Sequence, residues 1–397
     1  MSERLPPDDM KVRIADRVRA IDPELCALSN QLHADPEIGW QEHRSAAAVA
    51  TALAPHGFEI EQPYLGLETA FRAVRLPRGA HRFTVGFLAE YDALPGLGHA
   101  CGHNLISAIS VGGAIALAAV ADDLGLAVEV IGTPAEEGGG GKIVLLERGA
   151  FTELDFVLMA HPAPVDVAEA RPFAVTHWHV QYDGTAAHAA AYPERGVNAN
   201  DAFLVAQLAI GLLRQQLPAG VRVHGVQTRG GEAPNAIPER TEGRWYVRAE
   251  TTAQLLELEE RVRKCFEAGA LATGATLTIT PESERYAEMR TDEDALDRYR
   301  ENARALGRTF DVDPAAATMN RASTDMGNVS QMVNAIHPYI GVGGGASNHQ
   351  PDFAAACVGP KAEQTLRDGA TALAWTALDV TRNRSGVLRS SAAIPHD

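Results

Sequence analysis

One short segment of the chain carries three side chains that can bind a metal ion. It holds two histidines and a cysteine within five residues, in Gly98-His99-Ala100-Cys101-Gly102-His103-Asn104. Cys101 and His103 are two residues apart, and in an extended segment this spacing directs both side chains to one side. A thiol beside a divalent cation loses its proton, so Cys101 can serve as a ligand. His99, four residues before His103, is an alternative ligand.

Three later segments add ligands of the same kinds, each in a turn that glycine or proline marks. They are Glu136-Glu137 before four glycines, His161 before Pro162, and His349 after three glycines. Each residue alone is more often structural. Together the clusters supply a cysteine, three histidines and a glutamate, which is too many for one tetrahedral zinc and suits two metals that share a bridging ligand.

The two adjacent glutamates can have different roles in a hydrolytic site. Glu136 and Glu137 point in different directions, so one can bind a metal while the other faces the bound water and takes its proton. The alternative is a solvated acidic turn. The glycines and Lys142 that follow resemble a phosphate-binding loop, but Ile143 stands where that motif needs Ser or Thr.

The composition of the 397-residue chain restricts its partners. Its net charge of −16 argues against nucleic acid, because binding phosphates needs a basic surface. The four cysteines have no paired spacing, which favours a reducing compartment and therefore the cytoplasm. The first 22 residues are charged and lack the apolar region of a signal peptide.

The longest uncharged stretch, residues 105–121, is too short and too rich in Ser and Gly to span a bilayer. It predicts a buried helix with Asn104 or Ser107 near its N-cap, and we expect no membrane contact.

The elements that must position these ligands alternate between helix and strand. We predict helix over 23–53 with a break at Asp35-Pro36, strands at 81–89, 127–132 and 156–160, and helices at 105–121 and 142–148. This alternation indicates an α/β domain with a mostly parallel sheet. The ligand clusters at 98–104, 136–141 and 159–162 each follow a predicted strand. The carboxyl ends of strands are where such sheets carry their sites.

The pattern changes near Pro172 and predicts a compact α+β unit. Its elements are strand 173–182, helix 198–216, strands 221–228 and 240–249, helix 252–270 and strand 275–280. It is inserted, because the cluster at His349 follows it, so we divide the chain at 1–172, 173–284 and 285–397. The first strand alternates like an exposed strand, with His177 and His179 on a half-exposed face. The tail from Arg384 to Asp397 is predicted to be disordered.

Several motifs together resemble peptidase family M20, subfamily D, of the aminoacylase and carboxypeptidase superfamily. The matching stretches cover nearly the whole chain and are residues 89–95, 98–104, 134–139, 184–190, 235–238, 323–330 and 337–339. Asn104 and the last two stretches are most similar to the branch of p-aminobenzoyl-glutamate hydrolase and the β-alanyl-lysine-type dipeptidases.

The resemblance implies a binuclear metallopeptidase domain with an inserted lid that also forms a homodimer. The metal ligands that it implies are Cys101, as the bridge, with His103, Glu137, His161 and His349. It makes Glu136 the general base. Other branches have a ligating histidine where this chain has Glu90, which fits a shift of ligation to Cys101 and His103 and leaves Asp92 to orient a ligand.

Two residues of the predicted lid resemble substrate-binding residues of the family. His188 resembles a histidine that reaches a neighbouring subunit's active site and polarises the scissile carbonyl, and Asn235 resembles a residue that contacts substrate. For the carboxylate-binding arginine of the family, Arg248 is a candidate, and a surface or core-edge arginine is the alternative interpretation.

We therefore expect a cytoplasmic amidohydrolase that uses two divalent cations, zinc or manganese, on a small substrate. An N-acyl amino acid, an aroyl-glutamate or a dipeptide would fit. The alternatives are a hydrolytic deaminase on the same scaffold and a non-catalytic binding protein that retains the fold. Intact ligands and Glu136 argue against the second.

Overall fold

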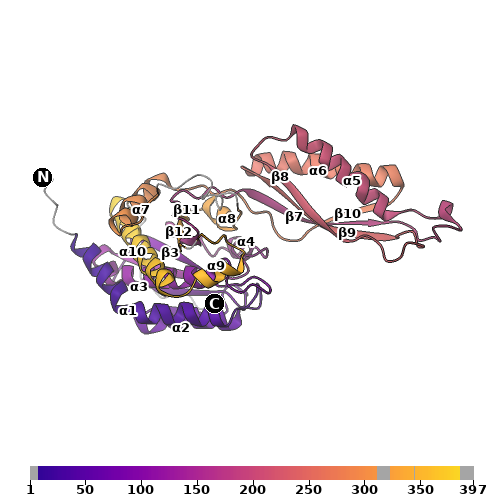
Figure 1. Cartoon of the computed structure of the whole chain (residues 1–397). Coiled ribbons are helices and arrows are strands. Elements are labelled where there is room, and N and C mark those ends of the chain that lie inside the picture. Colours follow the sequence, from indigo (N-terminus) through magenta and orange to yellow (C-terminus); the bar gives the residue numbers. More distant parts are fainter. Residues whose placement is uncertain (1–7, 311–321, 344, 385–397) are drawn as a thin grey trace. The chain divides into compact units, whose positions relative to one another are not determined.

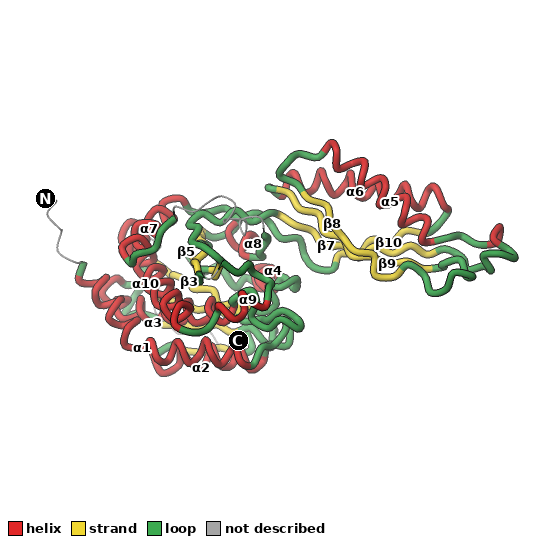
Figure 2. Tube along the Cα trace, in the orientation of Figure 1, coloured by secondary structure: helices red, strands yellow, loops and turns green. Residues whose placement is uncertain are grey.

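The computed structural model describes residues 8–310, 322–343 and 345–384 (Figures 1 and 2). Contacts between Cα atoms divide the chain into two compact units, Met1–Ala170 with Met289–Asp397, and Arg171–Glu288. The first unit contains all four ligand clusters, and the second is the inserted unit.

A six-stranded sheet forms the centre of the first unit, in the order β1-β2-β4-β3-β5-β11. The strands are β1 (Glu59–Glu61), β2 (Phe71–Arg75), β3 (Phe83–Glu90), β4 (Leu126–Thr133), β5 (Phe156–Leu158) and β11 (Asn334–Ile336). Strands β4, β3, β5 and β11 run parallel, and β1 and β2 add an antiparallel edge. This confirms the α/β class with a mostly parallel sheet. A separate parallel pair joins β6 (His161–Ala163) to β12 (Tyr339–Gly341).

The helices of the first unit pack around this sheet. They are α1 (Asp9–Ala34), α2 (His43–Leu53), α3 (His103–Leu124), α4 (Gly141–Glu147), α7 (Glu293–Ala305), α8 (Met326–Ser330), α9 (Pro351–Ala356) and α10 (Pro360–Asn383), with a 3₁₀ turn at Ala54–His56. The predicted break after α1 is confirmed. The predicted start at Pro23 is wrong, because Asp8 caps the helix by accepting a hydrogen bond from the backbone N–H of Met10 at 3.0 Å.

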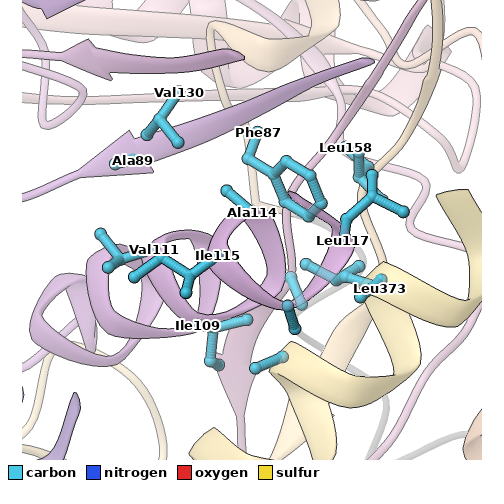
Figure 3. Packing of buried hydrophobic residues seen from close by; sticks show 14 of the residues in the cluster. Phe87, Ala89, Ile109, Val111, Ala114, Ile115, Leu117, Val130, Leu158 and Leu373 are labelled. Atoms are coloured by element: carbon cyan, nitrogen blue, oxygen red, sulfur yellow. The ribbon is translucent and has the colours of Figure 1, made fainter. Parts of the chain in front are cut away.

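Helix α3 is the central helix of the core. It packs against β3 and α10, where Phe87, Ala114, Leu117 and Leu373 lie together (Figure 3). A Cβ atom on Gly113 would lie 2.7 Å from Phe87, so the close approach requires glycine. Among the described residues α3 alone is long and apolar enough to cross a bilayer, but 89% of its most apolar stretch is buried inside the unit.

The start of α3 differs from the prediction. Gly102, in the left-handed region at φ 85°, is the N-cap residue. The Asn104 side chain instead donates to Ser29 Oγ at 2.9 Å, and the Ser107 hydroxyl donates to the carbonyl oxygen of Glu90 at 2.6 Å. Both side chains are fully buried, so they join helix to neighbouring elements rather than cap it.

The inserted unit is a four-stranded antiparallel sheet, in the order β10-β7-β9-β8, with two helices. Its elements are β7 (Ala174–Asp183), α5 (Ala199–Leu213), β8 (Arg222–Arg229), β9 (Arg240–Ala249), α6 (Thr252–Thr273) and β10 (Thr276–Pro281), with 3₁₀ turns at Pro193–Arg195 and Arg214–Gln216. The core between sheet and helices contains Trp178, Phe203, Trp245 and Phe266. The predicted order of strands and helices is confirmed.

Strand β7 is not the exposed strand that its alternation suggested. It lies between β10 and β9, and its residues from Ala174 to Trp178 are all buried. The ring of His177 packs against Tyr246 and Tyr286, with ring centres 4.2 and 5.4 Å apart. The predicted half-exposed position is confirmed for His179. It is wrong for His177, because the rings of Tyr246 and Tyr286 cover the His177 side chain.

The predicted disordered tail lies mostly outside the described residues, which end at 384. Arg384 itself donates a hydrogen bond to Asp292 at 2.7 Å, so the prediction does not hold for this residue.

Candidate metal centre

The turn between β3 and α3 presents Cys101 and His103. The left-handed Gly102 separates them, and a Cβ atom there would lie 2.8 Å from Pro162 and 3.2 Å from the sulfur of Cys357. Only glycine fits such a position. The two ligands therefore face the same site through a glycine turn and a helix start, and the extended segment assumed from their spacing is wrong.

His161 completes the first group of possible ligands. Its Nδ1 donates to the carbonyl oxygen of Pro162 at 2.8 Å, so Nε2 is the acceptor nitrogen and faces the thiol of Cys101, with Sγ 3.5 Å away. Burial lowers the pKa of His161 to about 4, so the ring is neutral, as a ligand must be. Cys101, His103 and His161 are buried, and their ligand atoms lie within 4.8 Å of one another.

A second group shares Cys101 with the first. It adds Glu137 and His349, again with ligand atoms within 4.8 Å of one another. Glu137 Oε1 is 3.4 Å from His349 Nε2, and the backbone N–H of His349 donates to the carbonyl oxygen of Ala100 at 2.8 Å. Residue 349 itself has φ 64°, a conformation that is uncommon outside glycine. The Cys101 thiol therefore belongs to both groups of candidate ligand atoms.

Asp92 joins the two groups through both of its oxygens. Oδ1 lies 3.1 Å from His103 Nδ1, and Oδ2 accepts the backbone N–H of Glu137 at 2.9 Å. The aspartate therefore contacts the ring of one candidate ligand and the backbone of another. Its role in orienting a ligand stays a prediction.

The donor atoms of this site fit a cation. His103 Nε2 and Glu137 Oε1 are buried and have no hydrogen-bond partner among the described residues. Burial raises the pKa of the Cys101 thiol well above its usual range, and the carboxylates of Glu137 and Glu136 raise it further. A nearby divalent cation reverses both effects, because it stabilises a thiolate and offsets the carboxylate charge.

Glu136 lies beside the ligands without belonging to either group. Its Oε2 is 3.9 Å from His103 Nε2, and its side chain is only 8% exposed. Burial raises the pKa of this carboxyl well above its usual range, and the charges of Glu90, Glu137 and Asp325 add to the shift. A carboxyl with this tendency to hold a proton can accept one from water and release it later.

The sequence analysis gave no role in the site to three buried residues near it, Lys142, Asp325 and His337. Lys142 Nζ lies 2.5 Å from Glu90 Oε1 and 2.7 Å from Asp325 Oδ1, and His337 packs edge-on to the ring of His161. Lys142 was considered only as a phosphate-loop residue. Its place at the start of a short apolar helix was the available signal for burial. His99 is buried against His33 and belongs to none of the ligand groups found among the described residues.

His188 and Asn235 lie side by side in the inserted unit. The backbone N–H of Ala189 donates to the carbonyl oxygen of Asn235 at 2.9 Å, and both side chains are exposed. The Nδ1 atom of His188 accepts the backbone N–H groups of Ala190 and Ala191 at 3.3 and 3.1 Å. This places the ring proton on Nε2, so the free edge of the imidazole is a hydrogen-bond donor.

Arg248 lies on the sheet of the same unit. Its Nε is 3.2 Å from His224 Nε2, and its guanidinium lies 5.9 Å from the ring centre of Tyr246. A pocket of about 340 Å³ is lined by His224, Gly225, Val226, Arg244 and Tyr246.

Residues 86–377 match the model of peptidase family M20/M25/M40. The chain belongs to this family. It is 42% identical over 384 residues to the Xaa-Arg dipeptidase of Mus musculus, covering 94% of this chain and 89% of the mouse enzyme. It is 31% identical over 284 residues to one of the p-aminobenzoyl-glutamate hydrolase chains of Escherichia coli K12, covering 66% of this chain and 57% of that protein.

Among solved structures, a dinuclear metal binding M20 peptidase of Bacillus subtilis superimposes with a TM-score of 0.68. The two chains are 20% identical, and the match covers 91% of this chain and 98% of the other, so it supports the fold. Membership of the M20 family identifies the chain as a hydrolytic enzyme of the metallopeptidase and amidohydrolase class. The resemblance to this family and branch is confirmed, and the non-catalytic alternative is set aside.

Replacing Asp92 by Asn should weaken metal binding by roughly 10- to 100-fold. An amide has one acceptor oxygen, whereas Asp92 accepts from both His103 and the backbone of Glu137. Titration of the metal-free protein with Mn²⁺ and Zn²⁺ measures the change. Asp155→Asn is a matched control, because Asp155 also accepts a backbone N–H, that of Thr84 at 2.8 Å, and belongs to none of the ligand groups. Equal affinities in the two variants would contradict the orienting role.

Proposed function

We propose that the protein is a dinuclear metal-dependent dipeptidase for dipeptides that end in a cationic residue. The observation that carries this proposal is the convergence of ligand side chains from four segments on Cys101, with Glu136 beside them. We assign the metal ligands as Cys101, His103, Glu137, His161 and His349, and the metal as zinc or manganese.

The chain's own residues supply the proton transfers in this mechanism. Bound divalent cations would acidify a water molecule and polarise the amide carbonyl. Glu136 takes the proton of that water at its carboxylate while the water oxygen forms a bond to the carbonyl carbon. The same carboxyl then gives the proton to the amide nitrogen as the carbon–nitrogen bond breaks. The products are a free amine and a carboxylate.

The substrate class rests on similarity and on charge. The 42% identity to an Xaa-Arg dipeptidase over most of both chains supports a dipeptide with a C-terminal arginine or lysine. The net charge of −16 favours the approach of a cationic substrate, an effect that salt screens. An aroyl-glutamate is the second candidate, supported by the 31% identity to a p-aminobenzoyl-glutamate hydrolase chain.

A substrate panel separates these candidates. The metal-free protein is reconstituted with zinc or with manganese and assayed on dipeptides ending in Arg, Lys, Ala and Glu, on p-aminobenzoyl-glutamate and on N-acetyl amino acids. We expect the dipeptides ending in Arg or Lys to have the highest kcat/KM. Preference for p-aminobenzoyl-glutamate would select the second candidate, and release of ammonia alone would indicate a deaminase. No turnover of any of these substrates, with metal bound, would contradict the proposal.

The two adjacent glutamates should respond differently to loss of charge. Glu136→Gln should lower kcat by roughly 100- to 10,000-fold and leave the metal content unchanged, because it removes a base and no ligand. Glu137→Gln should instead lose metal. Metal analysis and turnover numbers for both variants test the assignment. The reverse pattern would exchange the two roles.

We propose that the inserted unit acts as the lid and holds two chains together as a homodimer. Along α5, Leu204, Leu208 and Leu212 are 54, 62 and 76% exposed at a spacing of four residues, so they form one apolar stripe. The adjacent sheet ends in the largely exposed edge strand β8, and an exposed edge strand can pair with a strand of a second chain.

We further propose that His188, with Asn235, contacts the substrate bound by the partner subunit. The Nε2–H of His188 is a suitable donor to the developing oxyanion. We also propose that the protein is cytoplasmic. Its four cysteines are free, which agrees with the reducing conditions of that compartment.

Mixing two inactive variants tests this action across subunits. His188→Ala and Glu136→Gln should each be inactive alone, and heterodimers of the two should recover part of the activity, because one site has both groups intact. Leu208→Asp should produce monomers that lose activity, whereas Leu271→Asp, at an 88% exposed position on α6, should stay dimeric. Sedimentation and turnover measurements give both results. Heterodimers without activity would place His188 in its own subunit's site or outside catalysis.

A further inference from the structure

The mechanism proposed above leaves a buried ion triad beside the metal centre unused. It consists of Glu90 at the end of β3, Lys142 in α4 and Asp325 next to α8, and all three side chains have zero exposure. One ammonium group faces two carboxylates, so the triad has an excess negative charge. Burying such a charge without a partner is strongly unfavourable.

The excess charge lies on Glu90. Asp325 is fully engaged, because Oδ1 accepts from Lys142 Nζ at 2.7 Å and Oδ2 accepts from the backbone N–H of Lys142 at 2.9 Å. Only the Oε1 atom of Glu90 contacts the ammonium group of Lys142. Its Oε2 points toward the metal centre and lies 3.5 Å from His103 Nε2.

When the His103 ring is neutral, its hydrogen bond from Nδ1 to Asp92 leaves a lone pair on Nε2 that faces an oxygen of Glu90, and these two atoms repel each other. A proton on Nε2 or a metal cation between the two atoms removes this repulsion, and metal titration of Glu90 variants distinguishes the two. Both atoms are buried without a hydrogen-bond partner among the described residues. Together with Glu136, Glu90 and His103 form a third group of ligand atoms within 4.8 Å of one another.

We infer that Glu90 is a further metal ligand, through Oε2, while Lys142 and Asp325 hold its other oxygen. The inference rests on the two-metal centre of the proposed function. It departs from the sequence expectation that ligation shifts away from position 90. Through His103, Glu90 would add a carboxylate oxygen to the group that contains Cys101 and His161. Carboxylate oxygen is a ligand that suits manganese.

The test measures metal affinity rather than activity. Metal-free wild type, Glu90→Gln and Glu90→Asp are titrated with Mn²⁺ and with Zn²⁺ by calorimetry, and bound metal is counted by elemental analysis. Glu90→Gln keeps the size of the side chain. Glu90→Asp keeps the charge beside Lys142 but withdraws the oxygen from the site, so at least one variant should fold. We expect both to lose on the order of 10- to 100-fold in Mn²⁺ affinity at one of two sites, with a smaller loss for Zn²⁺.

Glu129→Gln is the matched control. Glu129 is a buried carboxylate on the neighbouring strand β4, paired with Arg72 at 2.6 Å, and it belongs to none of the ligand groups. This variant should have a lower melting temperature and bind both metals as the wild type does.

The outcomes distinguish the inference from the proposed function. Wild-type affinities in the Glu90 variants overturn the inference and leave the proposed function intact. An equal loss in the Glu129 variant also overturns it, because the effect would then be general destabilisation. A wild type that binds no metal overturns both.

Discussion

The structure of the first unit depends on holding five carboxylates together out of water. Glu90, Asp92, Glu136, Glu137 and Asp325 surround His103 or its immediate neighbours, and Lys142 is the buried lysine among them. Like charges at such distances repel strongly at low dielectric. The arrangement needs positive charge from outside the chain, or protons taken up by the acids and by His103. This requirement is the physical reason to expect cations there.

The parallel sheet meets this constraint by gathering the site at one edge. Strand β3 ends at Glu90 and β4 ends at Thr133, one turn before the two adjacent glutamates. The helices that follow are anchored by tight glycine turns. Gly102 allows Cys101 and His103 to face one site, and a Cβ atom on Gly141 would lie 1.8 Å from the carbonyl oxygen of Pro134. Glycines at these points allow side chains that follow different strands to lie within a few ångströms of one another.

Sequence reasoning found the side chains whose chemistry is distinctive, and it missed those whose role depends on distant partners. Cys101, His103, His161 and His349 stood out by residue type and by the turns around them. Lys142 and Asp325 are 183 residues apart, and neither has a local pattern that indicates the other. The burial of His177 was missed for a similar reason, since it depends on rings from β9 and from Tyr286. Local periodicity describes an isolated element, whereas burial is decided by what packs on it.

The two adjacent glutamates have the same side-chain chemistry, but their surroundings shift their pKa values in opposite directions. The Glu137 side chain is largely buried, at 15% exposure, which opposes ionisation, but His349 and His103 outweigh this and hold its pKa below the usual range. Glu136 is buried mainly among other acids, and its pKa is raised. Environments that move two carboxyl groups in opposite directions typically assign one to fixed negative charge and the other to proton transfer. The backbone N–H of Glu137 donates to Asp92, and the Glu137 side chain lies in one group of ligand atoms with Cys101. Asp92 therefore contacts both the ring of His103 and the backbone of the glutamate whose pKa is lowered.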